Sequence, residues 1–228
     1  MHSKRIREKV KEDYDAIAKT FSETRKKAWP EFDVFKAYLS PGLEVLDLGC
    51  GNGRLSAFLQ EAQVQSYLGL DQSVELLRMA QKNHPQEAFI LGDMANFSDL
   101  LSAHVPDNPS KKYDAIFMIA SFHHLPKENQ LHVLNQVYDR LKPGGFLFMT
   151  NWNLFQASFW KAWVKMLISR PYGWKGLPIL WQNQVERFYY AFSPKELRKL
   201  FREAHLELLE MQVGRNFVSI CKKNVLQP

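Results

Sequence analysis

The sequence has few of the features that mark secreted, disulfide-rich or membrane-spanning proteins. It contains only two cysteines in 228 residues, Cys50 and Cys221, which argues against a disulfide framework and a cysteine-rich metal cluster. No apolar run approaches the ~20 residues of a membrane span. The charged start, MHSKRIREKVKEDYD, lacks the apolar centre of a signal peptide. Repeats, low-complexity tracts and Gly/Ser-rich linkers are also absent. These absences favour a single globular domain in the cytoplasm.

The charge balance is moderately basic. Thirty Lys and Arg oppose 24 Asp and Glu, which gives a formal net charge of +6. Such an excess suits RNA or another anionic partner, and it suits equally well a scatter of solvated lysines. Hydrophobic residues make up 46% of the chain, enough for a substantial core.

Short apolar segments alternate with helical ones through the middle of the chain. Strands are predicted at residues 44–49, 66–71, 88–93, 113–121 and 144–152. Two further strands follow a helix that Ser193 and Pro194 begin, and the short turn between these strands predicts an antiparallel pair. The pattern predicts an α/β fold with a Rossmann-like, doubly wound seven-stranded sheet, mostly parallel with an antiparallel last strand.

We divide this single domain into four parts. They are an N-terminal helical lid (1–40), a cofactor-binding core (41–151), an aromatic-rich helical insert (152–190), and a closing helix with two strands (191–228). The insert holds five of the six tryptophans. These suit the core of a helical lid, a surface that contacts a membrane or a hydrophobic substrate, or a base-stacking platform. The platform would use the interleaved basic residues Lys161, Lys165, Arg170 and Lys175.

Three glycines follow the first predicted strand in VLDLGCGNG. A tight strand-to-helix turn without side chains lets a ligand lie against bare backbone. The spacing is G-x-G-x-G, whereas a dinucleotide site needs G-x-G-x-x-G and would place its last glycine where this chain has Arg54. Asp47 stands two residues before the first glycine, and a carboxylate there suits a cationic ligand better than a pyrophosphate.

Two further acids end the next two strands. Asp71 lies about twenty residues beyond the glycines, where a carboxylate can accept both hydroxyls of a ribose. Asp93 ends the third strand, placed to accept from an adenine amino group, and Met94 can pack on the adenine face. An adenosine with a cationic, amino-acid-bearing tail would fit all of these positions.

With these motifs in this order, the chain resembles the class I S-adenosylmethionine-dependent methyltransferases. VLDLGCGNG, YLGLDQS, ILGDMAN, YDAIFMIASFHHL and LKPGGFLFMT carry the resemblance over about residues 40 to 150. It implies S-adenosyl-L-methionine as cofactor. It also implies a set of binding residues: Asp47, Gly49, Gly51 and Gly53 at the methionine and ribose side, Asp71 and Gln72 at the ribose, Asp93 and Met94 at the adenine, and Ile119 to Ser121 at the sulfonium.

The N-terminal segment YDAIAKTFSETRKKAWPEFDVF is similar to the tRNA wobble-uridine carboxymethyl methyltransferases, and so are ERFYYAFSPKELRKL and GRNFVSICKK. The chain departs from that family in having Ala191 after its paired tyrosines and Phe217 where a tryptophan is usual. The insert from Trp152 to Trp181 matches no pattern of the family. The resemblance implies a tRNA partner and a possible small activating subunit.

The acceptor decides which side chains are needed. A carboxylate is ionised at neutral pH and needs a cation rather than a base, for which Arg25 is the first candidate and Arg187 and Arg215 are reserves. A phenol or hydroxyl needs a base, for which His123 or His124 is available. Tyr14, Arg25 and His124 are therefore the predicted catalytic residues.

Three functions remain open from the sequence. The first is esterification of a modified tRNA wobble uridine. The second is methylation of a small apolar carboxylic acid, phenol or quinone-like compound. The third is a non-catalytic scaffold, against which the intact glycine turn, Asp71 and Asp93 argue.

Overall fold

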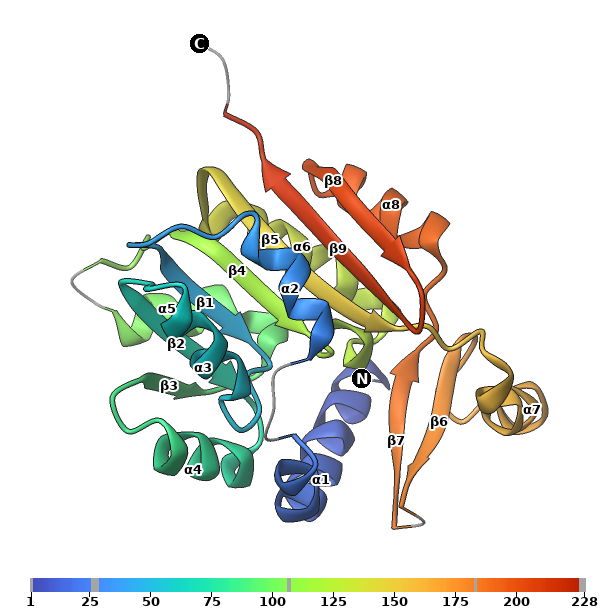
Figure 1. Cartoon of the computed structure of the whole chain (residues 1–228). Coiled ribbons are helices and arrows are strands. Elements are labelled where there is room, and N and C mark those ends of the chain that lie inside the picture. The colour runs from blue at the N-terminus through green and yellow to red at the C-terminus, as the bar shows by residue number, and fades with distance from the viewer. Residues whose placement is uncertain (1, 26–28, 106–107, 183, 226–228) are drawn as a thin grey trace.

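A seven-stranded sheet forms the centre of the molecule (Figure 1). The computed structural model describes residues 2–25, 29–105, 108–182 and 184–225. The strand order is β3-β2-β1-β4-β5-β9-β8, and β9 runs antiparallel to both of its neighbours. This confirms the predicted sheet. The strands are β1 (Glu44–Leu48), β2 (Ser66–Asp71), β3 (Ala88–Leu91), β4 (Tyr113–Ile119), β5 (Leu141–Trp152), β8 (Leu206–Val213) and β9 (Asn216–Lys223).

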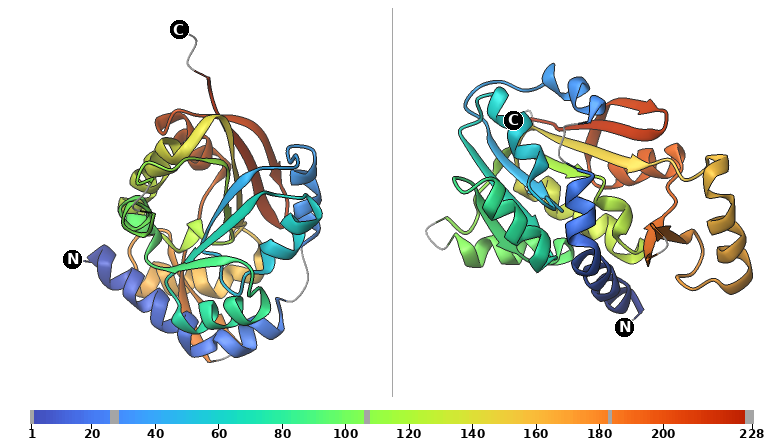
Figure 2. Two further views of the ribbon diagram at one scale, coloured as in Figure 1. Left: turned by 90° about the vertical axis from the view of Figure 1, so that its left-hand side faces the viewer. Right: turned by 60° about the horizontal axis from the view of Figure 1, so that its bottom comes forward.

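Helices cover both faces of this sheet, as Figure 2 shows. One face packs against α2 (Asp33–Lys36) and α3 (Arg54–Glu61), and the other against α5 (Phe97–His104), α6 (Lys127–Arg140) and α8 (Pro194–Glu203). Buried side chains fill both layers, so the strands are apolar on both sides as a parallel sheet requires. No helix in the described ranges combines the length and apolar character that a bilayer crossing needs.

The long first helix, α1 (His2–Glu23), lies beside α4 (Val74–Asn83) at the carboxyl ends of the parallel strands (Figure 1). Its apolar positions recur at helical spacing and are buried at Ile6, Val10 and Ile17. The segment predicted as a lid is therefore largely an amphipathic helix that packs on the core, at the carboxyl ends of the parallel strands.

The insert differs from its prediction. The sequence predicts a helical insert, but only α7 (Trp160–Ser169) and a short turn before it are helical. The second half forms an antiparallel hairpin of β6 (Gly176–Trp181) and β7 (Val185–Tyr190), separate from the main sheet. Pro178 lies within β6, which a two-stranded ribbon tolerates because each strand has one unpaired edge. Figure 1 shows β7 of this hairpin beside α1, which it contacts.

Candidate active site

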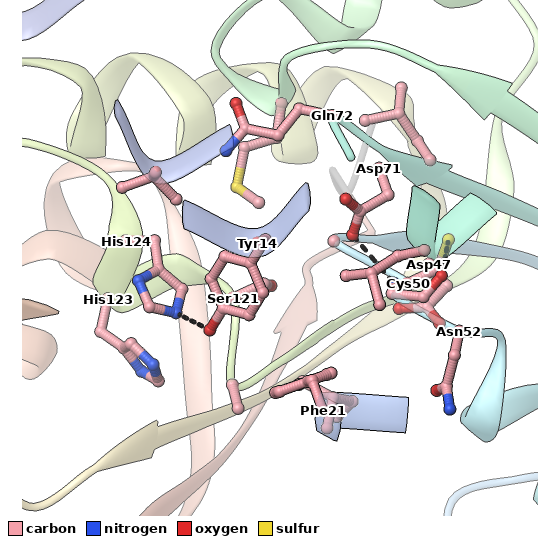
Figure 3. Close-up of a pocket in the computed structure, with 18 of the residues that line it drawn as sticks. Tyr14, Phe21, Asp47, Cys50, Asn52, Asp71, Gln72, Ser121, His123 and His124 are labelled. Carbon is pink, nitrogen blue, oxygen red and sulfur yellow. Dashed lines mark hydrogen bonds between the residues drawn. The ribbon is translucent and has the colours of Figure 1, made fainter. Parts of the chain in front are cut away.

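A cavity lies at the carboxyl ends of β1, β2 and β4, between α1 and β7. Together with its mouth it holds about 1050 Å³. Figure 3 shows the side chains that converge on it. It brings together these predicted site residues: Tyr14, Arg25, Asp47, Gly49, Gly51, Asp71, Gln72, Asp93, Met94, Ile119 and His124. Gly53 does not line it.

The three glycines of the turn share a positive φ but differ in what a side chain would meet. All have positive φ, +78° at Gly49, +58° at Gly51 and +79° at Gly53. A Cβ on Gly49 would lie 2.4 Å from the Cβ of Ser121, and one on Gly53 would lie 2.9 Å from the His84 ring. A Cβ on Gly51 would meet nothing within 4 Å. Packing within the chain therefore explains Gly49 and Gly53, whereas Gly51 faces open space.

Asp71 is held rigidly by backbone donors. The Gly51 N–H donates to its Oδ2 and the Ser73 N–H to its Oδ1, each at 2.8 Å. Burial raises the pKa of Asp71 in spite of these hydrogen bonds. Each carboxylate oxygen has a second lone pair, so Asp71 can still accept from a ligand hydroxyl.

Asp47 is a buried acid that lacks a full set of partners. Tyr67 donates to its Oδ2 at 2.8 Å, while Oδ1 has no hydrogen-bond partner within the described ranges. Burial raises the pKa of Asp47 to about 7. A carboxylate oxygen without a donor beside an open turn fits the ammonium group of S-adenosylmethionine, because a cation restores the missing interaction.

The end of the cavity near β3 is closed by α1. Arg7 donates from Nε to Asp93 Oδ2 at 2.6 Å, and Asp93 Oδ1 accepts from the Ala95 N–H. Met94 lies beside Gly49, so it is placed to pack on a flat ligand there. The sequence analysis missed Arg7, although it lies seven residues before Tyr14 and so on the same helix face.

Tyr14, His124 and Arg187 form one hydrogen-bonded chain at the other end. Arg187 donates from Nη1 to the Tyr14 hydroxyl at 2.9 Å. The same hydroxyl lies 2.8 Å from His124 Nε2, and His124 Nδ1 lies 2.8 Å from the Phe188 carbonyl oxygen. The neutral tautomer that fits has a proton on Nδ1, which donates to that carbonyl, so that Nε2 accepts from Tyr14.

Arg187 is a buried cation with no acid in direct contact among the described residues, although the charge of nearby Asp13 still acts on it. Its side chain is 1% exposed, and no Asp or Glu lies within ion-pair distance in the described ranges. The guanidinium carbon lies 4.7 Å from the ring centroid of Trp181 and 5.1 Å from that of Tyr189, and Nε has no acceptor. Burying a charge without a counter-ion is costly unless a ligand supplies one.

Neither cavity histidine is suited to act as a base. Burial lowers the pKa of His124 to about 3, with nearby Arg187 adding to the effect. Burial also lowers the pKa of His123 well below its usual value. Both rings stay neutral, and Nε2 of His124 is occupied by Tyr14. The site therefore suits an acceptor that is already ionised.

Arg25 lies at the mouth, half-buried among aromatic rings. It is 5.1 Å from the Phe21 ring centroid and 5.5 Å from that of Trp181, and its guanidinium donates to the carbonyl and hydroxyl oxygens of Thr24. Burial lowers its pKa, and the positive charge of Arg187 contributes in the same direction. Arg215 is exposed and does not line this cavity.

The sheet order and this cavity define an S-adenosylmethionine-dependent methyltransferase. The glycine turn, the unpaired Asp47 oxygen and the strand-end Asp71 fit that cofactor. Residues 6–211 match the family described as Methyltransferase domain, and the chain belongs to this family.

Known relatives agree with this assignment. The chain is 31% identical over 237 residues to the tRNA (carboxymethyluridine(34)-5-O)-methyltransferase of Schizosaccharomyces pombe, covering 95% of this chain and 97% of that protein. It spans smaller shares, from 22% to 50%, of three other relatives of that kind.

Solved structures share the fold. A SAM-dependent methyltransferase from Methanosarcina mazei has a TM-score of 0.70 at 20% identity, covering 87% of this chain and 99% of that one. A putative methyltransferase of Haloferax volcanii, in complex with the Trm112 methyltransferase activator, has a TM-score of 0.70 at 18% identity, covering 96% of this chain and 99% of that one.

Proposed function

We propose that the chain esterifies the side-chain carboxylate of 5-carboxymethyluridine at the wobble position of tRNA. The observation that carries the proposal is Arg187, a buried guanidinium that lines the cavity and forms an ion pair with no acid among the described residues. A ligand carboxylate would supply the missing anion and accept from the free guanidinium N–H groups. The Schizosaccharomyces pombe relative is named as a tRNA (carboxymethyluridine(34)-5-O)-methyltransferase, which supports this acceptor.

The chemistry asks little more of the protein. S-adenosylmethionine supplies an activated methyl group, so the chain must bind, align and exclude water. A carboxylate has an ordinary pKa near 4 and is ionised at neutral pH, so no base is needed. Tyr14 and Arg187 hold one side of the acceptor end, and Arg25 is a second cation at its mouth. The neutral histidines argue against the alternative phenol or hydroxyl acceptor.

The partners belong to the same proposal. The tRNA is the proposed substrate. A small activating subunit is the second proposed partner, since the Haloferax volcanii neighbour is seen with such a protein. The cytoplasm, where tRNA is modified, is the proposed compartment. Assaying the purified chain with and without candidate subunits that co-purify with it would test the second partner.

Two measurements test the function. Mass spectrometry of tRNA nucleosides from cells lacking the protein should show loss of the methyl ester and accumulation of the free acid. Purified protein should restore the ester on that tRNA with S-adenosylmethionine as donor. Unchanged nucleosides in such cells, with no transfer by the purified protein or its co-purifying complex, would contradict the proposal.

Arg187 is tested directly by Arg187→Gln. Loss of two charge-assisted hydrogen bonds should lower kcat/KM for the tRNA by about 100-fold or more, while cofactor affinity stays within about threefold. Arg140→Gln is the matched control, because Arg140 is also buried but donates to Ser98 and Pro109, away from the cavity. Arg140→Gln should cost stability and leave the turnover of the folded protein intact.

A further inference from the structure

A second cavity opens beside the acceptor end of the first. Three segments wall it: Trp29–Glu31 before α2, the start of the insert from Trp152 to Phe159, and the β8–β9 turn at Arg215 and Asn216. Figure 1 shows that turn lying beside the end of β5, where the insert begins. With its mouth the second cavity holds about 950 Å³. Arg25, Trp29 and Trp152 line both cavities, so the two lie next to each other.

Aromatic rings and amides line this second cavity. Trp29, Trp152 and Phe159 contribute rings, and those of Trp152 and Phe159 lie 6.2 Å apart. The Gln156 amide donates from Nε2 to two backbone carbonyls, which leaves its oxygen to accept. The Asn216 amide donates to Glu31 and likewise keeps its oxygen. Planar rings beside amide acceptors suit an unstacked nucleobase.

The side chains that line this cavity carry more positive than negative charge. Arg215 is exposed, and its guanidinium makes no hydrogen bond or ion pair within the described ranges. Glu31 is the acid among the lining residues, and it already accepts from Asn216 at 2.7 Å. Arg25 lies at the junction with the first cavity. A phosphate running from one cavity to the other would pass between two arginines and meet both charges.

We propose that the second cavity binds the nucleotide adjacent to the methylated uridine, with its base against Trp29 and Phe159 and its phosphate on Arg215. This inference rests on the proposed function, because it requires a nucleotide in the first cavity. A nucleotide within an RNA strand cannot enter that cavity alone, since its phosphodiester continues out of the mouth. The second cavity adjoins that mouth. Its aromatic rings, amide oxygens and Arg215 suit the base and the phosphate of the neighbouring nucleotide.

Activity on two substrates distinguishes the role of the second cavity from that of the first. One is an anticodon stem-loop RNA carrying 5-carboxymethyluridine, which would fill both, and the other is the isolated 5-carboxymethyluridine nucleoside, which would fill only the first. Phe159→Leu keeps apolar volume but removes the ring, and should lower kcat/KM on the stem-loop by about 5- to 150-fold, as loss of one stacked base does. Arg215→Gln should lower it by about tenfold. Both variants should act on the nucleoside within about threefold of the unaltered protein.

Binding gives an independent readout and a control. Arg215→Gln should reduce the salt dependence of stem-loop binding by about 0.7 in log–log slope, the effect of one phosphate contact on a single strand. Arg78→Gln is the matched control, since Arg78 is an exposed arginine on α4 that pairs with Glu75 of the same helix. It removes the same charge, and it should change neither stem-loop binding nor turnover.

The outcomes distinguish the two proposals. Equal losses on both substrates, or no loss on the stem-loop, would overturn the second cavity as a nucleotide site. Failure of the unaltered protein and of its co-purifying complex to esterify the stem-loop would contradict the proposed function itself, and the inference with it.

Discussion

We expect Asp47 to make cofactor binding depend on pH. Its pKa of about 7, raised by burial from an ordinary 3.8, means that the protein binds a proton there that the unfolded chain would release. Its contribution to stability is therefore fully present below about pH 4 and is lost as pH rises through about 7. Cofactor binding has the opposite sign, because an ammonium group favours the ionised carboxylate.

We expect the affinity for S-adenosylmethionine to rise as pH increases from about 5.5 to 7 and then to level off, with release of a fraction of a proton on binding. Calorimetry in buffers of different ionisation enthalpy measures both quantities. Asp47→Asn should bind more weakly and lose the pH dependence. A variant that keeps the dependence would show that another group carries it.

Asp71 offers a second test at the same scale. Loss of a charge-assisted hydrogen bond to the ribose should make Asp71→Ala bind S-adenosylmethionine about 10- to 150-fold more weakly. Asp139→Ala, an exposed acid on α6, is the control for loss of charge alone. Unchanged affinity in folded Asp71→Ala protein, measured by calorimetry, would refute the ribose assignment.

Residues at strand ends could be placed from the sequence because strand position fixes them. Asp47 and Asp71 each follow from one strand and one turn, and both line the cavity. Arg187 could be named only as a reserve, since its burial depends on a hairpin that meets α1 across 173 residues of sequence. No local pattern reports such a long-range contact. The roles of all these residues in binding and catalysis stay predictions.

At the scale of elements, the glycine turn must pack against the rest of the chain at Gly49 and leave room for the cofactor at Gly51. Substitutions at these two positions test the two requirements separately. Gly49→Ala should destabilise the fold by roughly 1–3 kcal/mol, because its Cβ would overlap Ser121 at a positive φ. Gly51→Val overlaps no atom of the protein, so its stability cost comes from backbone strain at a positive φ, and it should abolish cofactor binding by exclusion. Thermal denaturation and calorimetry together give both quantities. Wild-type affinity in Gly51→Val would mean that this turn is only structural.

The sequence pattern predicted the secondary structure of the core and of α8 better than that of the insert. The alternation of strands and helices between residues 44 and 152 predicted the sheet, and Ser193 with Pro194 begins α8 as predicted, with Glu196 completing a capping box. The insert was predicted to be helical, and this was wrong for β6 and β7. Its tryptophans are spread over the end of β5, a helix, a turn and a hairpin, so aromatic content alone carries no period that separates these elements.

The whole molecule carries a net charge of +6, which predicts a salt-sensitive association with tRNA. Lys161 and Arg170 lie exposed on and after α7, and Arg198 and Lys199 lie on α8. Lys26 and Lys27, further candidates from the sequence, lie outside the described residues.

Lys161→Glu combined with Arg170→Glu should weaken tRNA binding and flatten its salt slope by about 0.7 per lost contact, with unchanged cofactor affinity. Filter binding across a salt series, with cofactor titration in parallel, measures this. Arg78→Glu is the control for charge reversal on another surface. A slope that stays the same in the double variant would exclude α7 from the tRNA interface.

The first helix also has a thermodynamic consequence. Through Arg7 and Asp15, α1 holds Asp93 and Ser73 on the cofactor side, and through Tyr14 it holds His124 and Arg187 on the acceptor side. Any displacement of α1 therefore disrupts both halves at once, so donor and acceptor each favour the same position of one helix. We therefore expect their binding free energies to be coupled, in which case reciprocity requires the donor to strengthen acceptor binding by the same factor as the acceptor strengthens donor binding.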